Sequence, residues 1–292
     1  MKVSPENTVV GFIGIGVMGN SMAGHILNAG YELHVYSRSR AKAELICQKG
    51  AVWEDTTSQL AKKCNVIITI VGFPKDVEEV YLGPDGIIEN AAPEAIVIDM
   101  TTSSPSLAVK IYDAAQKRSI HALDAPVSGG DIGARNAALS IMVGGDTASF
   151  EAVMPLFEIM GKNIHFQGKS GSGQHTKMVN QISIAAGMVG LCESLAYAVK
   201  SGLDPETVLR SIGAGAAASW TLNNLGPRII KGDFAPGFYV RHFIKDMGIA
   251  IESAQEMGLD LPGLMLAKSL YDKLAQKGYE YDGTQALYRL FI

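Results

Sequence analysis

The sequence is short of the residues that mark several classes of protein. It contains only three cysteines, Cys47, Cys64 and Cys192, which are widely spaced and form no C-x-x-C pair. An odd number of scattered cysteines argues against a disulfide framework and fits a reducing compartment. The six histidines form no H-E-x-x-H or comparable spacing, so we expect no metal site.

Charge is also scarce and evenly spread. Only 18% of the residues are charged, the net charge is -4, and no block of Lys and Arg is interleaved with aromatics. This argues against a nucleic-acid partner and against attachment to an anionic membrane. We find neither a leader-like segment nor an apolar run approaching the roughly 18 to 20 residues that span a bilayer. We therefore expect a cytoplasmic protein, no membrane partner and a small-molecule ligand.

What the sequence has is apolar residues, 47% of 292, enough for two cores. Its first part alternates predicted strands with predicted helices. Continuous apolar strands are typical of a parallel sheet buried on both faces. The alternation predicts a doubly wound, Rossmann-type α/β domain. The predicted strands are Val9–Ile15, Glu32–Tyr36, Asn65–Val71, Ala95–Met100, His121–Ala125, Leu139–Val143 and Asn163–Phe166, with helices between them at Arg40–Lys49, from about Lys75 and Pro105, and at Thr147–Met160.

From Gly171 onward no strand pattern is found, and the periodicity is helical. We therefore predict a dinucleotide-binding domain at 1–169 and an all-α substrate and oligomerisation domain at 170–292. Gly187 and Gly190 are unfavourable inside the first of the predicted helices, and we expect close helix packing to explain them. The predicted helices are Gln174–Ser201, one starting at Asp204-Pro205, Ser219–Lys231, Arg241–Met257 and Pro262–Gln276.

The most informative stretch follows the first predicted strand and has the pattern G-x-G-x-x-G. Gly14 permits a tight turn, Gly16 leaves room for a pyrophosphate, and Gly19 lets strand and helix pack closely. A glycine turn that binds nothing is the alternative, but the position between a β-branched strand and a helix disfavours it. The predicted cofactor-binding residues are Gly14, Ile15, Gly16, Val17, Met18 and Gly19.

The end of the second predicted strand indicates which dinucleotide is bound. A NAD-binding unit carries an acid about 20 positions beyond the glycine turn, where it accepts hydrogen bonds from the ribose. Here the chain reads Tyr36-Ser37-Arg38-Ser39-Arg40 instead. Because Arg binds phosphate through charge-assisted hydrogen bonds, we predict that Ser37, Arg38 and Ser39 bind a 2′-phosphate. This favours NADP, with NAD possible, unless the arginines are merely solvated loop charges.

Four blocks of sequence occur in a characteristic order: the glycine turn extended to Met22-Ala23, DAPVSGG at 124–130, GSGQHTKMVNQ at 171–181, and KDM at 245–247. Together they resemble the β-hydroxyacid dehydrogenase family, which includes 3-hydroxyisobutyrate dehydrogenases, tartronate semialdehyde reductases and glyoxylate/succinic semialdehyde reductases. The resemblance covers essentially the whole chain. It implies hydride transfer between NADP(H) and a small β-hydroxyacid or its semialdehyde, a carboxylate substrate, and a homodimer or homotetramer.

The resemblance also implies roles for individual residues. Lys177 would be the general acid/base, and Asn180 and Gln181, at i+3 and i+4 on the same predicted helix, would orient the lysine and the substrate. The donor-rich turn Ser128, Gly129 and Gly130 would hold the substrate carboxylate. The remaining assignments are Lys245, supported by Asp246, as a cofactor contact; Met18, Phe73, Pro74 and Thr102 beside the nicotinamide half; and Trp220 and Phe238 as walls of the substrate pocket.

The chain departs from the family pattern at two places. Ala137-Ala138 stands where relatives usually carry Gly followed by Thr or Ser, and Gln181 replaces a frequent asparagine. Both departures leave the choice of substrate open. Two alternatives also remain: a non-catalytic NADP-binding module, which would have little need of Lys177, and an imine reductase-like enzyme on the same fold, a group that usually replaces this lysine.

Overall fold

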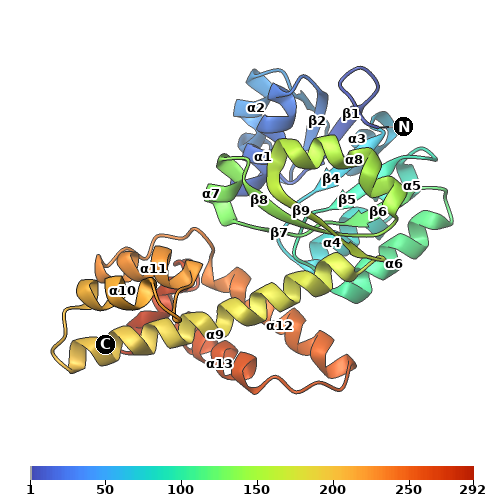
Figure 1. Cartoon of the computed structure of the whole chain (residues 1–292). Coiled ribbons are helices and arrows are strands. Elements are labelled where there is room, and N and C mark those ends of the chain that lie inside the picture. The colour runs from blue at the N-terminus through green and yellow to red at the C-terminus, as the bar shows by residue number, and fades with distance from the viewer. Residues whose placement is uncertain (1) are drawn as a thin grey trace. The chain divides into compact units, whose positions relative to one another are not determined.

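The computed structural model describes residues 2–292, and its internal contacts divide the chain into two compact units (Figure 1). The first unit ends at Lys177, and the second runs from Met178 to Ile292. All the named strands belong to the first unit, and each unit has its own apolar core. The predicted fold class, a Rossmann-type α/β domain followed by an all-helical domain, is confirmed.

One sheet organises the first unit, with strand order β3-β2-β1-β4-β5-β6-β8-β7 and β9 paired with β8. Strands β1 to β6 run parallel, whereas β7 and β8 pair in the antiparallel sense. The order reverses between β1 and β4, and ligands of such sheets bind outside the carboxyl ends of the strands at that point. The strands are β1 (Val9–Ile13), β2 (Glu32–Tyr36), β3 (Val52–Trp53), β4 (Val66–Thr69), β5 (Ile96–Asp99), β6 (His121–Asp124), β7 (Val127–Ser128), β8 (Leu139–Gly144) and β9 (Gly161–Gly168).

Helices cover both faces of this sheet, which explains why its strands read as continuous apolar runs. In β1 and β4, Phe12 and Ile68 face one core, while their neighbours Ile13 and Ile67 face the other. Helices α1, α2 and α8 contribute to the first of these cores, and α3 to α6 to the second. The helices are α1 (Val17–Asn28), η1 (Arg40–Ala43), α2 (Glu44–Gln48), α3 (Thr57–Lys63), α4 (Pro74–Leu82), α5 (Ile87–Asn90), α6 (Pro105–Gln116), α7 (Gly130–Arg135) and α8 (Thr147–Met160).

The shortest elements are those that sequence periodicity did not predict. Strands β3 and β7 have two residues each, and helices α3, α5 and α7 have seven, four and six. So few residues cannot display a hydrophobic period. The helix predicted at Arg40–Lys49 is instead a 3₁₀ turn followed by α2. Between Gly130 and Leu139, where no helix was predicted, lies α7, and Ala137 after it has φ 50.

The second unit is helical, and its core gathers Met188, Leu195, Phe243 and Tyr271 among others. The predicted N-cap of α10 is confirmed, because the Asp204 side chain accepts from Thr207 N at 3.0 Å. Across residues 178–292 the only strand-like pairing is the isolated bridge between Tyr239 and Gly283. The helices are α9 (Ser172–Lys200), α10 (Pro205–Gly213), α11 (Trp220–Ile230), α12 (Val240–Glu256), α13 (Pro262–Gln276) and η2 (Thr284–Leu290).

Helix α9 differs from two of the expectations. By length and composition it could cross a membrane, so the expectation that no segment reaches that threshold was wrong. The core helix of a soluble protein passes the same test, and α9 supplies Met188, Leu191 and Leu195 to the core of the second unit. A Cβ added at Gly187 or Gly190 would meet no atom within 4 Å in the described chain. The close packing expected at these glycines is therefore not found within the described residues.

The division between the two units falls inside α9. Its first turn is bound by the Asp124 side chain of the first unit, which accepts from Gly171 N and Gln174 N. A domain boundary at residue 169 stays a prediction.

Candidate functional site

The glycine turn between β1 and α1 has the backbone geometry that a dinucleotide fingerprint requires. Gly14 has φ +104, and a Cβ there would lie 2.1 Å from Ile70 O. A Cβ at Gly19 would lie 1.9 Å from Gly14 O, whereas one at Gly16 would meet nothing within 4 Å. The outer two glycines are thus required by contacts with backbone, and Gly16 faces open space.

The beginning of α1 leaves backbone donors without an intrahelical partner. Gly16 is the N-cap residue, and the first intrahelical bond runs from Asn20 N to Gly16 O at 2.9 Å. The amides of residues 17–19 precede that bond and face outward together with the positive end of the helix dipole. Ile15 is buried, Met18 packs partly on the core, and Val17 is exposed. These residues fit a pyrophosphate, which helix N-termini bind readily.

The ribose loop, residues 37–39, follows β2 and contains a cation already paired with an acid. Arg38 is 80% exposed, and its Nη1 donates to Asp76 Oδ1 at 3.0 Å. Ser37 and Ser39 flank it, with Ser39 as the N-cap residue of η1. The Arg40 guanidinium instead lies over the ring of Trp53, 5.6 Å from its centroid. Sequence reasoning missed Asp76, although an acid in the first turn after Phe-Pro is a recognisable helix-start signal.

The predicted nicotinamide contacts follow β4 and β5. Phe73 is the N-cap residue of α4, Pro74 is its first helical residue, and Thr102 is half-buried after β5. The neighbouring Thr101 is buried and accepts from Val71 N through its hydroxyl at 2.9 Å. Since carboxyl ends of parallel strands share one edge of a sheet, these residues lie on the same edge as the glycine turn.

A buried carboxylate holds the first turn of α9 to the sheet. Asp124, at the end of β6, accepts from Gly171 N at 2.8 Å and from Gln174 N at 2.9 Å. Burial raises the pKa of Asp124 to about 6, although these backbone donors favour its charged form. The fully buried Gln174 donates to Thr101 O at 2.7 Å and accepts from Ser103 N at 2.9 Å. Both residues lie in recognised motif blocks, yet their anchoring role depends on contacts between distant segments and was not predicted.

Lys177 is brought to the strand that leads into the predicted carboxylate-binding turn. Its side chain is buried, and its Nζ donates to Val127 O at 2.8 Å. Val127 directly precedes Ser128, and the two form β7. Gly129 and Gly130 both have positive φ, +126 and +60, which glycine adopts most readily. The predicted proton donor and the predicted substrate turn therefore meet within the first unit.

The other predicted polar residues form a chain of contacts inside the second unit. Asn180 Nδ2 donates to Gln181 Oε1 at 2.7 Å, and the buried Gln181 donates through Nε2 to Asp246 Oδ2. Lys245 Nζ lies 3.0 Å from Asp246 Oδ1, so Asp246 does contact Lys245 as expected. The bond from Gln181 to Asp246 was not predicted. The glutamine side chain is longer than that of the asparagine frequent in the family, and in this structure the amide of Gln181 contacts the buried carboxylate of Asp246.

The two aromatic residues predicted as pocket walls have different surroundings. Trp220 begins α11 and is exposed. Phe238 packs on Phe243, with ring centroids 5.5 Å apart, at the margin of the core of the second unit. Phe238 therefore contacts the core, and a part for either aromatic in a substrate pocket stays a prediction.

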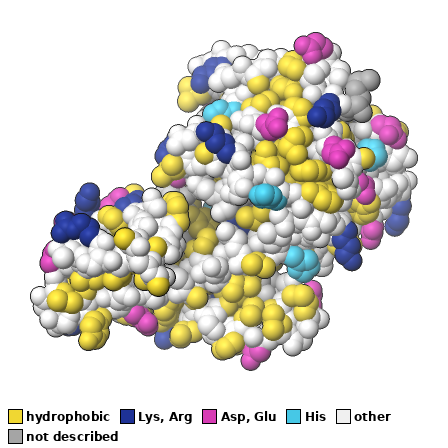
Figure 2. Space-filling view, viewed as in Figure 1, with side chains coloured by type: hydrophobic (Ala, Val, Ile, Leu, Met, Phe, Trp, Pro, Cys, Tyr) yellow, Lys and Arg dark blue, Asp and Glu magenta, His cyan; other side chains and the backbone are white. Residues whose placement is uncertain are grey.

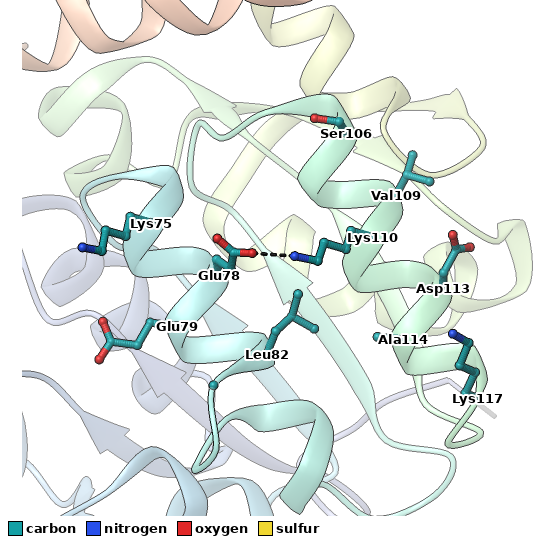
Figure 3. A pocket seen from close by; sticks show the side chains of 11 residues that line it. Lys75, Glu78, Glu79, Leu82, Ser106, Val109, Lys110, Asp113, Ala114 and Lys117 are labelled. Atoms are coloured by element: carbon teal, nitrogen blue, oxygen red, sulfur yellow. Dashed lines mark hydrogen bonds and ion pairs between the residues drawn. The ribbon is translucent and has the colours of Figure 1, made fainter.

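A groove of about 880 Å³ lies between α4 and α6 (Figure 3). The Lys110 ammonium crosses it to Glu78 at 2.6 Å, and both signs of charge line it. None of the predicted cofactor or substrate residues belongs to its lining. On the face drawn in Figure 2, Lys and Arg side chains lie scattered among acidic and apolar ones. Among residues 2–292, no three His, Cys, Asp or Glu side chains are grouped to hold a metal ion.

Comparison with known proteins finds family models that match both parts of the chain. One, described as the NAD binding domain of 6-phosphogluconate dehydrogenase, matches residues 9–168. Another, described as NAD-binding of NADP-dependent 3-hydroxyisobutyrate dehydrogenase, matches residues 171–291.

Full-length relatives agree with these matches. An uncharacterized oxidoreductase of Bacillus subtilis (strain 168) is 64% identical over 283 residues, 97% of this chain and 98% of that protein. The 2-hydroxy-3-oxopropionate reductase of Escherichia coli (strain K12) is 39% identical over 269 residues, 92% of this chain and 92% of that protein. A solved structure of Mycobacterium tuberculosis 3-hydroxyisobutyrate dehydrogenase with L-serine is 26% identical, with a TM-score of 0.90 over 97% of this chain and 98% of that one.

Proposed function

The chain belongs to the β-hydroxyacid dehydrogenase family, and from that premise we propose that it reduces a small semialdehyde acid with NADPH, using Lys177 as general acid. Like its relatives, it is an oxidoreductase that acts on CH–OH groups with NAD(P). The preference for NADP, the substrate class and the role of Lys177 are the new parts of the proposal.

The cofactor would be held by the glycine turn and the ribose loop. The open space at Gly16 and the outward amides at the start of α1 support binding of its pyrophosphate. The exposed guanidinium of Arg38, between two serines, supports binding of a 2′-phosphate. When bound, a nicotinamide cofactor supplies or accepts the hydride. The protein's own task is to orient the substrate and to move a proton.

The observation that carries the proposal is the contact of Lys177 with Val127 O. It holds a buried ammonium next to a turn of small residues in which Gly129 is exposed and both glycines have positive φ. We propose that Ser128, Gly129 and Gly130 bind the substrate carboxylate and so present its carbonyl group to Lys177. In reduction Lys177 would donate its proton to the carbonyl oxygen, and in oxidation its amine would take the proton from the hydroxyl.

The second unit would supply the supporting groups. We propose that Asn180 and Gln181 orient the lysine and the substrate, and that Lys245 contacts the cofactor with Asp246 beside it. In the described structure Gln181 is already bonded to Asn180 and Asp246. This favours an orienting role for Gln181 over direct substrate contact.

We also propose a homodimer or homotetramer. Val179 and Tyr197 are exposed on α9, and Gly187 and Gly190 on the same helix face open space. A second copy of the chain would cover such an apolar, small-residue surface. Light scattering of the purified protein tests this, and a monomeric mass at micromolar concentration would contradict it.

The decisive test is a panel of small aldehyde acids assayed for oxidation of NADPH and, separately, of NADH. Succinic semialdehyde, glyoxylate, tartronate semialdehyde and methylmalonate semialdehyde cover the expected substrates. We expect turnover of at least one of them, faster with NADPH at low cofactor concentration. Matched aldehydes without a carboxylate serve as controls. Equal turnover of these controls would contradict binding of the substrate carboxylate by the turn. Cyclic imines are assayed alongside, and reduction of these imines alone would favour an imine reductase.

A further inference from the structure

An ion pair joins the ribose loop to the first turn of α4, the helix that follows β4. Arg38 Nη1 donates to Asp76 Oδ1 at 3.0 Å, while Asp76 Oδ2 accepts from Phe73 N at 3.1 Å. Strands β2 and β4 flank β1 in the sheet. The ion pair therefore connects the segments that follow β2 and β4, on either side of the glycine turn, where the ribose phosphate is expected.

The two partners are held very differently. Asp76 stands in the first turn of α4, where the helix dipole favours a negative charge, and its side chain is only 19% exposed. Its Oδ2 also accepts from Phe73 N at 3.1 Å, which holds the carboxylate at the beginning of the helix. Arg38 is 80% exposed, and within residues 2–292 its side chain has no hydrogen bond or ion pair besides the one to Asp76. The carboxylate thus stays in place when the guanidinium turns toward a ligand.

A fixed carboxylate at this point works against a phosphate in two ways. It neutralises Arg38 before the cofactor arrives, and it repels a phosphomonoester, which carries about -1.5 to -2 charges at pH 7. An ion pair this exposed is weak enough to be exchanged for the phosphate. The carboxylate nevertheless remains within the range of unscreened Coulomb repulsion. NADH, which lacks the 2′-phosphate, is not subject to that repulsion.

We propose that Asp76 is a specificity-determining residue that limits the preference for NADP by acting through Arg38. The inference rests on the proposed binding of the 2′-phosphate by Arg38. The ribose loop has no acidic residue of its own, and Asp76 in the first turn of α4 would take that place. A protein with two arginines near the ribose could then still bind NADH.

The test is direct binding of NADPH and NADH to the full-length protein, followed by cofactor fluorescence without any substrate. Asp76→Asn keeps an oxygen that accepts from Phe73 N, so we expect an unchanged melting temperature. The dissociation constant for NADPH should fall about three- to tenfold, while that for NADH changes by less than about twofold. Glu78→Gln is the matched control, because it removes the same charge from α4 but faces Lys110 (Figure 3). It should change neither constant.

The same measurement in an Arg38→Ala background separates the possible failures. There Asp76→Asn should strengthen NADPH binding clearly less than it does with Arg38 present, because the cation that Asp76 neutralises is gone and only the direct repulsion remains. The inference is overturned if Arg38→Ala weakens NADPH binding but Asp76→Asn does not strengthen it, if both cofactors respond equally, or if the full effect persists without Arg38. If Arg38→Ala leaves NADPH binding unchanged, the proposed NADP site itself fails, and this inference fails with it.

Discussion

The glycine turn after β1 and the beginning of α9 serve the same proposed reaction but are built in opposite ways. The turn requires residues without a side chain, because a Cβ at Gly14 would lie 2.1 Å from Ile70 O. The beginning of α9 depends on buried polar atoms that are present, namely the Asp124 carboxylate and the Lys177 ammonium. The first region should therefore be sensitive to any added methyl group, and the second to the loss of a single charge or acceptor.

The largest effect is expected from removing the Lys177 ammonium. General acid/base groups contribute about 10²- to 10⁴-fold, so Lys177→Ala should reduce kcat by that order. NADPH affinity should stay nearly unchanged, because the glycine turn and Arg38 are untouched. Steady-state kinetics and cofactor fluorescence measure the two quantities separately.

Lys177→Arg is the matched variant, because a guanidinium keeps the charge but cannot release its proton at useful pH. We expect it to be as slow as Lys177→Ala. If Lys177→Arg kept most of the turnover, the lysine would be an electrostatic anchor, and the acid would have to be another group.

The glycine turn can be tested with a pair of alanine variants. In Gly19→Ala the new Cβ would lie 1.9 Å from Gly14 O, so we expect the free energy of unfolding to fall by about 1–3 kcal/mol. Cofactor binding should weaken as well. In Gly16→Ala the methyl group meets no protein atom, so the melting temperature should be preserved. NADPH affinity should still fall about tenfold or more, because the methyl group would occupy the space of the pyrophosphate. Normal NADPH binding by Gly16→Ala would mean that no pyrophosphate approaches this backbone.

A smaller effect, on the Michaelis constant for NADPH, is expected from replacing the exposed Arg38. Replacing Arg38 by Asp removes charge-assisted hydrogen bonds worth about 1.5–3 kcal/mol, so the Michaelis constant for NADPH should rise about tenfold or more. The constant for NADH should rise much less. Equal use of both cofactors by the unmodified protein, or no change in the variant, would contradict an NADP site here.

The hydrogen bonds from the first turn of α9 to Asp124 should contribute about 1–3 kcal/mol to the free energy of unfolding. Asp124→Asn replaces one accepting oxygen by an N–H₂ group that faces a backbone donor, so the free energy of unfolding should fall by about that amount at pH 7. Chemical denaturation measures it. Unchanged stability would mean that the first turn of α9 does not depend on this carboxylate.

The buried carboxylates of Asp99 and Asp124 should also make the stability of the protein depend on pH. Burial raises the pKa of Asp99 and of Asp124 to about 6, above the ordinary 3.8. Between those values the folded protein binds protons that the unfolded chain does not, so these two groups make stability rise as pH falls from about 6 toward 4. The profile of Asp124→Asn should be flatter over that window, and a steeper one would contradict the assignment.

The smallest effect concerns the turn after α7. Ala137 has φ 50, a left-handed conformation in which a Cβ costs about 1–2 kcal/mol. Ala137→Gly should remove that strain and raise the melting temperature slightly, without changing NADPH affinity. A lower melting temperature would show that the gain of backbone entropy in the unfolded chain, which glycine brings, matters more here than the strain.

Local pattern accounts for much of what could be predicted. The apolar runs of β1, β4 and β5 are long enough to show that they are buried on both faces, and the helical period of α9 extends over many turns. The glycine turn was recognisable because its requirements are local: a positive φ at Gly14 and a close approach at Gly19. The residues of the four motif blocks were also visible in the sequence, although their chemistry came from a resemblance.

The sequence by itself determined the fold class, the glycine turn and the face of α9 that carries Lys177, because each depends on neighbours only a few residues apart. Only the tertiary structure decided the partners of the charged side chains. Asp76 lies 38 residues from Arg38, and Asp246 lies 65 from Gln181. Val127 lies 50 from Lys177. Contacts across such separations depend on how strands and helices are packed. The periodicity of a local segment contains no information about which distant side chains that packing brings together.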